Sequence, residues 1–436
     1  MDTFKREMRG ARVLIIGLVV VLLVIGLALI ISLLARPVQS TAGTPAVNAL
    51  ALSTNECVTC HRRATPGIVE QYGVSVMAAA NVTCQDCHEV APNYAGAKAH
   101  QGTYILSSPT AAKCQACHPS EVTQFDQSRH ALPAWVAFAG SKDLSPDLMK
   151  QYQSVPEGQF SPNKDRNIIG AMEGPDVTRF ACETCHNVGR PAADGSVGQC
   201  QKCHMRHSFS LSDVRKPETC NQCHIGPDHP QWEIYIESPH GIAYHTQGQT
   251  WNWEAVPGTL TAADFPAPTC ATCHFSGFGS AGTTHDVGDR LTWFLFAPIS
   301  ERRPAWQDNM VRMQSICLQC HNKQFVDTFY AGADKEVLRI NEWVKQSDQM
   351  MSDAKKANLL TDAPFDQPID FAYFELWHHY GRTSKFGTWM QGPDYTQWHG
   401  AYEILARLAD IRKDIEDAAN NLKAGNLATP TPGSQK

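Results

Sequence analysis

Residues 220–241 read CNQCHIGPDHPQWEIYIESPHG, and the first five of them form the pattern Cys-x-x-Cys-His. The pattern occurs eight times in the 436-residue chain and accounts for all 16 cysteines. It is the attachment signal of c-type haem, whose vinyl groups form thioethers with the two thiols while the adjacent histidine binds the iron. We therefore predict eight covalently bound c-type haems. The motif residues are, in chain order, Cys57, Cys60 and His61; Cys84, Cys87 and His88; Cys114, Cys117 and His118; Cys182, Cys185 and His186; Cys200, Cys203 and His204; Cys220, Cys223 and His224; Cys270, Cys273 and His274; and Cys317, Cys320 and His321.

Zinc sites and disulfides are the alternative interpretations of paired cysteines. Zinc sites use Cys-x-x-Cys pairs, but they do not require a histidine directly after every pair. Only 18 of the 436 residues are histidine, so eight chance placements are excluded. Because every cysteine belongs to a haem motif, none remains for a disulfide, an iron–sulfur cluster or a nucleophilic thiol.

The overall composition describes a globular protein with no sign of nucleic-acid binding. Hydrophobic residues make up 43% of the chain and charged residues 18%, which excludes a disordered polymer. The formal net charge is −6, whereas nucleic-acid-binding proteins usually carry a basic surface. We therefore expect no nucleic-acid partner.

The N-terminal segment predicts a membrane anchor. Val13 to Ala35 is an unbroken run whose one polar member is Ser32, long enough to span a bilayer as a helix. Basic residues precede the run, which places residues 1–36 as a cytoplasmic N-terminus and transmembrane anchor. A long cleaved signal peptide is the alternative. The haem domain would then lie in the periplasm or otherwise outside the cytoplasmic membrane.

The rest of the chain predicts a mainly α fold with few strands. Residues 37–55 resemble a linker, 56–328 hold the haem motifs in short helices and loops, 329–425 form a C-terminal helical region, and 426–436 form a disordered tail. Haems rather than side chains are expected to fill much of the interior of the motif-bearing domain. Apolar spacing predicts long C-terminal helices over Lys335–Leu360, Asp370–Tyr380 and Pro393–Lys423.

Ten histidines lie outside the motifs and are candidates for the second axial position of the irons. A haem iron that only carries electrons usually has two axial protein ligands, whereas a catalytic iron keeps one position open. His245 is a weaker candidate, and of the adjacent pair His378 and His379 we expect one to reach a given iron. The predicted distal ligands are His100, His130, His207, His240, His285, His378, His379 and His399.

His229 is treated separately because prolines flank it. It lies in Gly226-Pro227-Asp228-His229-Pro230, where the prolines restrict the backbone and exclude a regular helix. An Asp–His pair held beside haems can accept and deliver protons. A loop carboxylate beside a solvated histidine is the alternative.

The chain resembles the octahaem hydroxylamine oxidoreductase family through its eight motifs and three further segments. These segments are CHIGPDHPQWEIYIESPHG at 223–241, THDVGDRLTW at 284–293 and GPDYTQWHGAYE at 392–403. The resemblance implies a mainly helical homotrimer with closely packed haems. It also implies that the haem of the fourth motif is the open, catalytic one, that Asp228 and His229 line its pocket, and that Tyr395 is the residue that can crosslink to the catalytic haem of a neighbouring subunit.

The leading functional hypothesis is therefore oxidation of hydroxylamine to nitric oxide or nitrite, with electrons leaving through bis-histidine haems. The first alternative is the reverse reaction, reduction of nitrite or hydroxylamine. The second is a non-enzymatic, membrane-tethered electron conduit, in which every iron has two protein ligands. The expected redox partner is a cytochrome c or a quinone-linked membrane protein.

Overall fold

The haem motifs fold into short helical turns. In the computed structural model, three motifs coincide with helices α6 (Cys84–His88), α13 (Cys182–His186) and α17 (Cys270–His274). Thr269 and Thr272 exchange hydrogen bonds at the start of α17 and cap it. Residues three and four apart share one face of a helix, so both thiols and the histidine ring of a motif project to the same side.

The structure describes residues 55–156, 160–205 and 207–425. The predicted anchor over residues 1–36, the linker up to residue 54 and the tail over 426–436 lie outside the described residues. Within the described residues, no helix combines the length and the apolar character needed to cross a bilayer.

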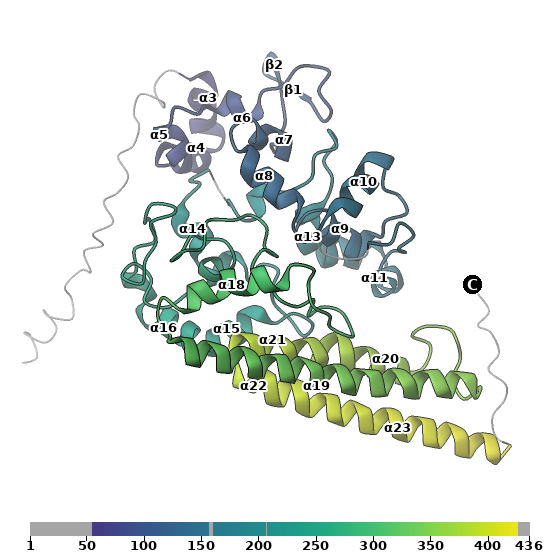
Figure 1. Ribbon diagram of the computed structural model, residues 1–436. Helices are drawn as coiled ribbons and strands as arrows, with labels where there is room; N and C mark the ends of the chain where they lie inside the picture. Colours follow the sequence, from purple (N-terminus) through teal and green to yellow (C-terminus); the bar gives the residue numbers. More distant parts are fainter. Residues whose placement is uncertain (1–54, 157–159, 206, 426–436) are drawn as a thin grey trace, which may run out of the picture. The chain divides into compact units, whose positions relative to one another are not determined.

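Short helices and connecting loops make up the motif-bearing region (Figure 1). Its remaining α-helices are α3 (Glu56–Ala64), α4 (Pro66–Gly73), α5 (Val76–Ala79), α7 (Ala111–Gln115), α8 (Pro119–Asp126), α9 (Leu132–Ala139), α10 (Pro146–Ser154), α11 (Ile168–Glu173), α12 (Pro175–Phe180), α14 (Leu211–Arg215), α15 (Gln231–Glu237), α16 (Pro239–Gln247) and α18 (Trp306–Cys317). The 3₁₀ turns are η1 (Asn187–Gly189), η2 (Cys200–Lys202), η3 (Pro217–Thr219) and η4 (Gly248–Thr250). Strands β1 (Lys98–His100) and β2 (Thr103–Ile105) form one antiparallel hairpin. The prediction of a mainly helical chain with few strands is confirmed.

Three long helical runs follow the eighth motif, over residues 323–356, 368–390 and 393–423, and the second and third of them consist of several consecutive elements. The elements are α19 (Lys323–Lys356), α20 (Pro368–Phe374), the π-helical turn η5 (Glu375–Gly381), α21 (Arg382–Met390), α22 (Pro393–Thr396), the π-helical turn η6 (Gln397–Ala401) and α23 (Tyr402–Lys423). The helix predicted from Lys335 begins earlier, at Lys323, because Asn322 accepts a hydrogen bond from the Phe325 amide and caps the helix directly after motif eight. The other two predicted helices are interrupted by the π-helical turns.

The largest side-chain core lies between these C-terminal helices. Figure 1 shows α19, α20 and α23 running alongside one another. Ile340 and Val344 of α19 are fully buried against Leu376 of η5 and against Ile404 and Ile411 of α23. Ile340 and Val344 are four residues apart and Ile404 and Ile411 are seven apart, so each of these two pairs lies on one face of its helix. Because this core contains no haem motif, it can hold the C-terminal helices together by ordinary apolar packing.

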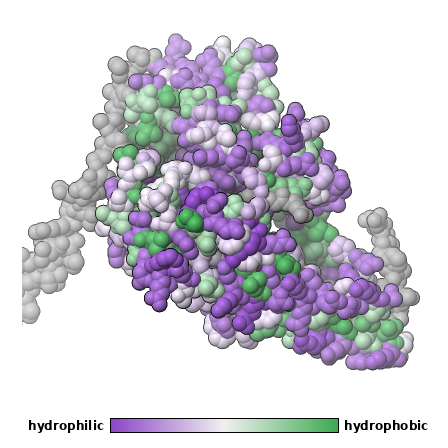
Figure 2. Space-filling model, viewed as in Figure 1, coloured by the Kyte–Doolittle hydropathy of each residue, from purple (hydrophilic) through white to green (hydrophobic). Residues whose placement is uncertain are grey.

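The motif-bearing region has three separate cores among its described residues, and the largest of them surrounds Trp251, Phe265 and Ile316. A second contains Leu132, Val136 and Tyr152, and the third contains Val58 and Tyr72. On the outside, Figure 2 shows small hydrophobic patches within a mainly hydrophilic face. The expectation that haems fill much of the interior stays a prediction.

Replacement of Ile340 by Ala should lower the free energy of unfolding by about 3 kcal/mol, because the buried cavity left behind cannot close fully. Leu338 lies on the same helix but is 53% exposed, so Leu338→Ala should cost about 0.5 kcal/mol. Guanidinium unfolding followed by circular dichroism measures both values. Equal losses in the two variants would contradict the assigned core.

Candidate haem sites and substrate pocket

Five motif histidines face a second histidine at the distance expected for two ligands of one metal ion. Each metal–imidazole bond is about 2 Å long, so two ligand rings on opposite sides have centres about 6 Å apart. The observed centre-to-centre distances are 6.0 Å for His61–His100, 6.2 Å for His88–His207, 6.4 Å for His204–His285, 5.9 Å for His224–His130 and 6.1 Å for His321–His240. The residues present therefore fit a haem iron at five motifs.

Hydrogen bonds orient several motif histidines for metal binding. Nδ1 of His88 donates to the Leu106 carbonyl at 2.7 Å, and Nδ1 of His186 donates to the Ala134 carbonyl at 2.6 Å. A ring nitrogen that donates to a carbonyl carries the proton, which leaves the lone pair on Nε2. This is the arrangement by which proteins fix the tautomer and direction of a metal-binding histidine. All 16 cysteines are free of disulfides, as haem attachment requires.

Contacts between thiols of different motifs show which motifs are neighbours in space. If each motif carries a haem, the contacts order the motifs as one, two, three, five, six, seven and eight, with motif four beside motif six. Such proximity suits electron transfer along the series. The thiol pairs in which one thiol affects the pKa of the other are Cys57 with Cys84, Cys87 with Cys114, Cys114 with Cys200, Cys185 with Cys223, Cys203 with Cys220, Cys220 with Cys270 and Cys273 with Cys317.

Motif four differs from the five paired motifs. Within the described residues, no second histidine lies opposite His186 with its ring centre about 6 Å away. The same is true of His118 in motif three and of His274 in motif seven. The pKa of His186 is lowered, first by burial and then by the nearby His229, and the carboxylate of Asp228 acts on it as well. The predicted Asp–His pair therefore acts on the histidine of motif four, and it also borders motif six, since the ring centres of His229 and His224 are 6.0 Å apart.

The Asp–His pair is formed within a fixed loop. Nδ1 of His229 donates to Oδ1 of Asp228 at 2.6 Å, in a non-helical segment that ends at the start of α15. The hydroxyl of Thr383, on α21, donates to the Pro227 carbonyl at 3.0 Å and anchors the loop to the C-terminal helices. Burial raises the pKa of Asp228, but the hydrogen bond and charge of His229, with smaller contributions from His378 and Arg382, lower it to about 2. Asp228 is therefore ionised at neutral pH.

Arg382, on α21, joins this pair to His378. Its Nη1 lies 3.5 Å from Oδ2 of Asp228 and donates to Nε2 of His378 at 2.9 Å, while its Nε donates to the Phe296 carbonyl. Burial lowers the pKa of Arg382 to about 10, so the guanidinium stays charged at neutral pH. Nothing in the cysteine or histidine pattern indicates Arg382, which lies beyond the end of the predicted helix Asp370–Tyr380 and reaches His378 because the helical run continues into α21.

Three of the predicted distal ligands lack the position expected of a second axial ligand. The structure does not bring His378, His379 or His399 opposite a motif histidine. Nε2 of His378 is occupied by Arg382, and the charge of Asp228 acts on His379. His399 pairs with Asp394 at 2.7 Å. The weaker candidate His245 is exposed at the end of α16.

Tyr395, the predicted crosslinking residue, lies on α22. Its ring stacks on His399 with the centres 5.0 Å apart. Burial and the carboxylates of Glu237, Glu233 and Asp394 raise its pKa. This position leaves the side chain partly exposed.

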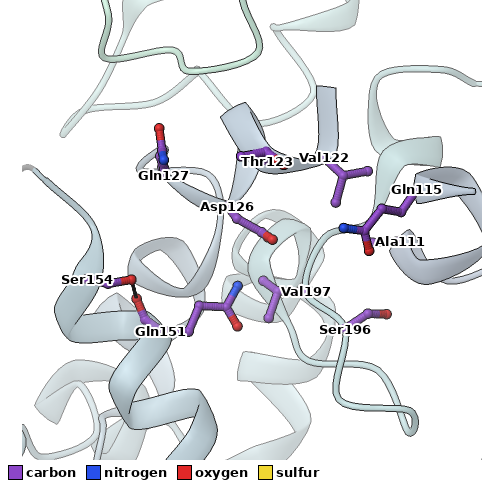
Figure 3. Close-up of a pocket in the computed structure, with 10 residues that line it drawn as sticks. All are labelled: Ala111, Gln115, Val122, Thr123, Asp126, Gln127, Gln151, Ser154, Ser196 and Val197. Atoms are coloured by element: carbon purple, nitrogen blue, oxygen red, sulfur yellow. Dashed lines mark hydrogen bonds between the residues drawn. The ribbon is translucent and has the colours of Figure 1, made fainter. Parts of the chain in front are cut away.

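A polar cavity of about 350 Å³ lies beside motifs three and five (Figure 3). Asp126 projects from the end of α8 among its lining residues, which include Gln115, Gln151 and Ser196. One carboxylate oxygen of Asp126 is buried without a hydrogen-bond partner, and burial raises the pKa to about 6. Its charge also acts on Cys200 of motif five. No sequence pattern marked Asp126.

Comparison with known proteins gives one family and several relatives. The family described as "Seven times multi-haem cytochrome CxxCH" matches residues 80–368, which contain motifs two to eight. A "probable nitrite reductase-hydroxylamine oxidoreductase fusion protein" of Kuenenia stuttgartiensis is 28% identical over 256 residues, which cover 50% of this chain and 25% of that protein. The chain thus matches about a quarter of that relative's length.

Two solved structures share the fold. A "hypothetical multiheme protein" superposes with a TM-score of 0.70 at 22% identity, covering 86% of this chain and 98% of the other. A chain of the "reducing HAO-like protein complex Kustc0457/Kustc0458" of Kuenenia stuttgartiensis gives a TM-score of 0.65 at 19% identity, covering 85% of this chain and 86% of the other. The motif-bearing region and the C-terminal helices therefore belong to a known multihaem architecture.

Replacement of Asp126 by Asn should remove a pH-dependent loss of stability. Because the folded pKa of about 6 exceeds the unfolded value of about 3.9, the wild type loses stability as pH rises from 4 through 6. The free energy of unfolding of Asp126→Asn, taken relative to that of the wild type, should be about 1–2 kcal/mol higher at pH 8 than at pH 4 after allowance for solvent screening. Urea unfolding at both pH values measures the difference.

The exposed Asp143→Asn variant controls for the loss of one surface carboxylate. A stability difference between Asp126→Asn and wild type that is the same at pH 4 and pH 8 would show that Asp126 does not titrate in a buried setting.

Proposed function

Because the chain belongs to the multihaem cytochrome family with CxxCH motifs, we propose that it is an octahaem oxidoreductase acting on a small nitrogen compound beside Asp228 and His229. The family carries covalently bound c-type haems. A count of eight is supported by the sequence, since the family match holds seven motifs and Cys57, Cys60 and His61 precede it. The primary reaction proposed is oxidation of hydroxylamine to nitric oxide or nitrite.

The observation that carries this proposal is the environment of motif four. Five motif histidines face a second histidine, and of the three that do not, His186 is the one on which the ionised Asp228 and its hydrogen-bonded partner His229 act. Cys182, Cys185 and His186 would hold a haem, which would supply redox chemistry for the nitrogen compound and a path for electrons. An electron conduit has no need of a proton-handling pair at one site, which favours the enzyme over the conduit.

The Asp–His pair supplies the acid–base chemistry. The carboxylate of Asp228 accepts a hydrogen bond from the Nδ1–H of His229, which orients the ring and leaves a lone pair on Nε2. Nε2 of His229 can therefore take a proton from hydroxylamine, and the resulting imidazolium is stabilised by the adjacent carboxylate. In the reverse direction the same imidazolium delivers a proton to nitrite or hydroxylamine.

Reduction of nitrite or hydroxylamine is the second candidate. The names of two relatives support it, since one is a fusion of a nitrite reductase with a hydroxylamine oxidoreductase and the other is described as reducing. In the oxidative case we propose that Tyr395 crosslinks to the catalytic haem of a neighbouring subunit. Its partly exposed position on α22 is compatible with contact to another chain.

The proposed setting is a homotrimer tethered to the membrane by Val13–Ala35, with the haem domain outside the cytoplasmic membrane. Trp398, Tyr402 and Leu405 are each half exposed or more on η6 and α23, and this apolar stripe supports subunit contact. A cytochrome c or a quinone-linked membrane protein would exchange electrons with the haem series.

Electron paramagnetic resonance of the oxidised, haem-loaded protein tests the proposal. We expect at least one high-spin iron whose signal changes on addition of hydroxylamine, nitrite or cyanide, because an open axial position accepts an exogenous ligand. Eight low-spin haems that are indifferent to all three ligands would instead support the electron conduit.

The His229→Ala variant separates binding from proton transfer. Hydroxylamine should still perturb the high-spin signal, while the rate of hydroxylamine-dependent haem reduction should fall by about 10²-fold, the usual contribution of a general base. An unchanged rate would remove His229 from the mechanism.

A further inference from the structure

The hydrogen bond between Arg382 and His378 determines where the proton of His378 lies. Nη1 of Arg382 is 2.9 Å from Nε2 of His378. A guanidinium has only donors, so Nε2 must be the acceptor. A neutral imidazole with an accepting Nε2 carries its hydrogen on Nδ1, which makes Nδ1 a donor.

This donor has no partner in the protein. Nδ1 of His378 is buried and makes no hydrogen bond. The ring stacks on Phe374 with the centres 4.2 Å apart and contacts the edge of Trp377 at 5.0 Å, and neither carbon face supplies a hydrogen-bonding oxygen. A buried donor without a partner is costly, so native proteins rarely leave one unless a ligand or cofactor completes the bond.

The unpartnered donor lies in the same cluster of side chains as the Asp–His pair. Arg382 contacts both His378 and Asp228, and the charges of Asp228 and His229 act on His378. The groups facing His378 are thus Arg382, Asp228, His229 and His379. Burial, followed by the positive charge of Arg382, lowers the pKa of His378 to about 3, which keeps the ring neutral and its tautomer fixed.

We propose that the Nδ1–H of His378, whose tautomer Arg382 fixes, donates a hydrogen bond to an anionic oxygen held beside these side chains. The inference rests on the proposed function, which places a nitrogen compound there. Two groups carry an anionic oxygen that suits this donor: nitrite, and a propionate carboxylate of the haem at motif four.

Two substitutions at one position test the proposal. The amide nitrogen of Asn reaches about the position of Nδ1, so His378→Asn keeps the donor but loses the contact with Arg382. The amide of Gln reaches about the position of Nε2, so His378→Gln keeps an acceptor for Arg382 but loses the Nδ1 donor. Nitrite affinity is measured by optical titration of the oxidised protein, and haem midpoint potentials are measured by spectroelectrochemistry.

If nitrite is the acceptor, its affinity should fall about tenfold in His378→Gln and stay within about threefold of wild type in His378→Asn. If a propionate is the acceptor, nitrite affinity should be unchanged, while the midpoint potential of one haem shifts in His378→Gln and not in His378→Asn. Unchanged affinity and potentials in His378→Gln, or equal changes in both variants, would overturn the proposal.

A crystal of the wild-type protein soaked in sodium nitrite gives an answer even if a variant fails to fold. An oxygen of nitrite or of a propionate should lie within about 3.2 Å of Nδ1 of His378. The absence of any acceptor oxygen at that distance would refute the inference. If nitrite and hydroxylamine bind no haem of the wild type, the proposed function fails, whereas the propionate measurement still decides the role of His378.

Discussion

The pairing of motif histidines with second histidines from distant segments is the constraint on which the rest of the fold depends. His224 faces His130, and His321 faces His240, at separations that suit two ligands of one metal ion. Each such pair ties two segments together at a fixed distance. Short helices and loops with small side-chain cores can then form a stable domain, because the cofactors supply bulk and crosslinks that a larger apolar core would otherwise provide. The C-terminal helices differ in this respect, since Ile340, Ile404 and their neighbours pack against one another directly.

Three motif histidines, His118, His186 and His274, lack such a partner among the described residues, and we propose that motif four carries the chemistry. Near His186 the chain provides charged and hydrogen-bonding groups in place of a second histidine. The carboxylate of Asp228 is held ionised by His229 and Arg382, and Arg382 in turn fixes the tautomer of His378. A single guanidinium therefore influences an acid–base pair and a potential donor to an anion. We propose that this arrangement lets one site bind a nitrogen compound and exchange its protons, whichever way the electrons run.

The sequence predicted the local features well, because each is determined by neighbouring residues. The spacing of cysteines and histidine marks every haem motif, and the prolines beside Asp228 and His229 keep that segment out of a helix. The long helix predicted from Lys335 exists but starts at Lys323, where Asn322 caps it. The distal pairing was beyond sequence reasoning, since the apposition of two rings depends on tertiary packing. His378 and His379 lie on a π-helical turn, and Arg382 binds the nitrogen of His378 that was expected to reach an iron. Asp126 carried no signal because its burial arises only when α8 packs beside motifs three and five.

The most direct test of this account is a crystal structure of the haem-loaded protein with diffraction data collected at the iron absorption edge. The account predicts eight iron positions, one of them between the rings of His130 and His224. It also predicts that the iron bound by His186 has no histidine on its opposite face and lies beside the Asp228–His229 pair. A second histidine on that iron, or the absence of iron between His130 and His224, would contradict the account.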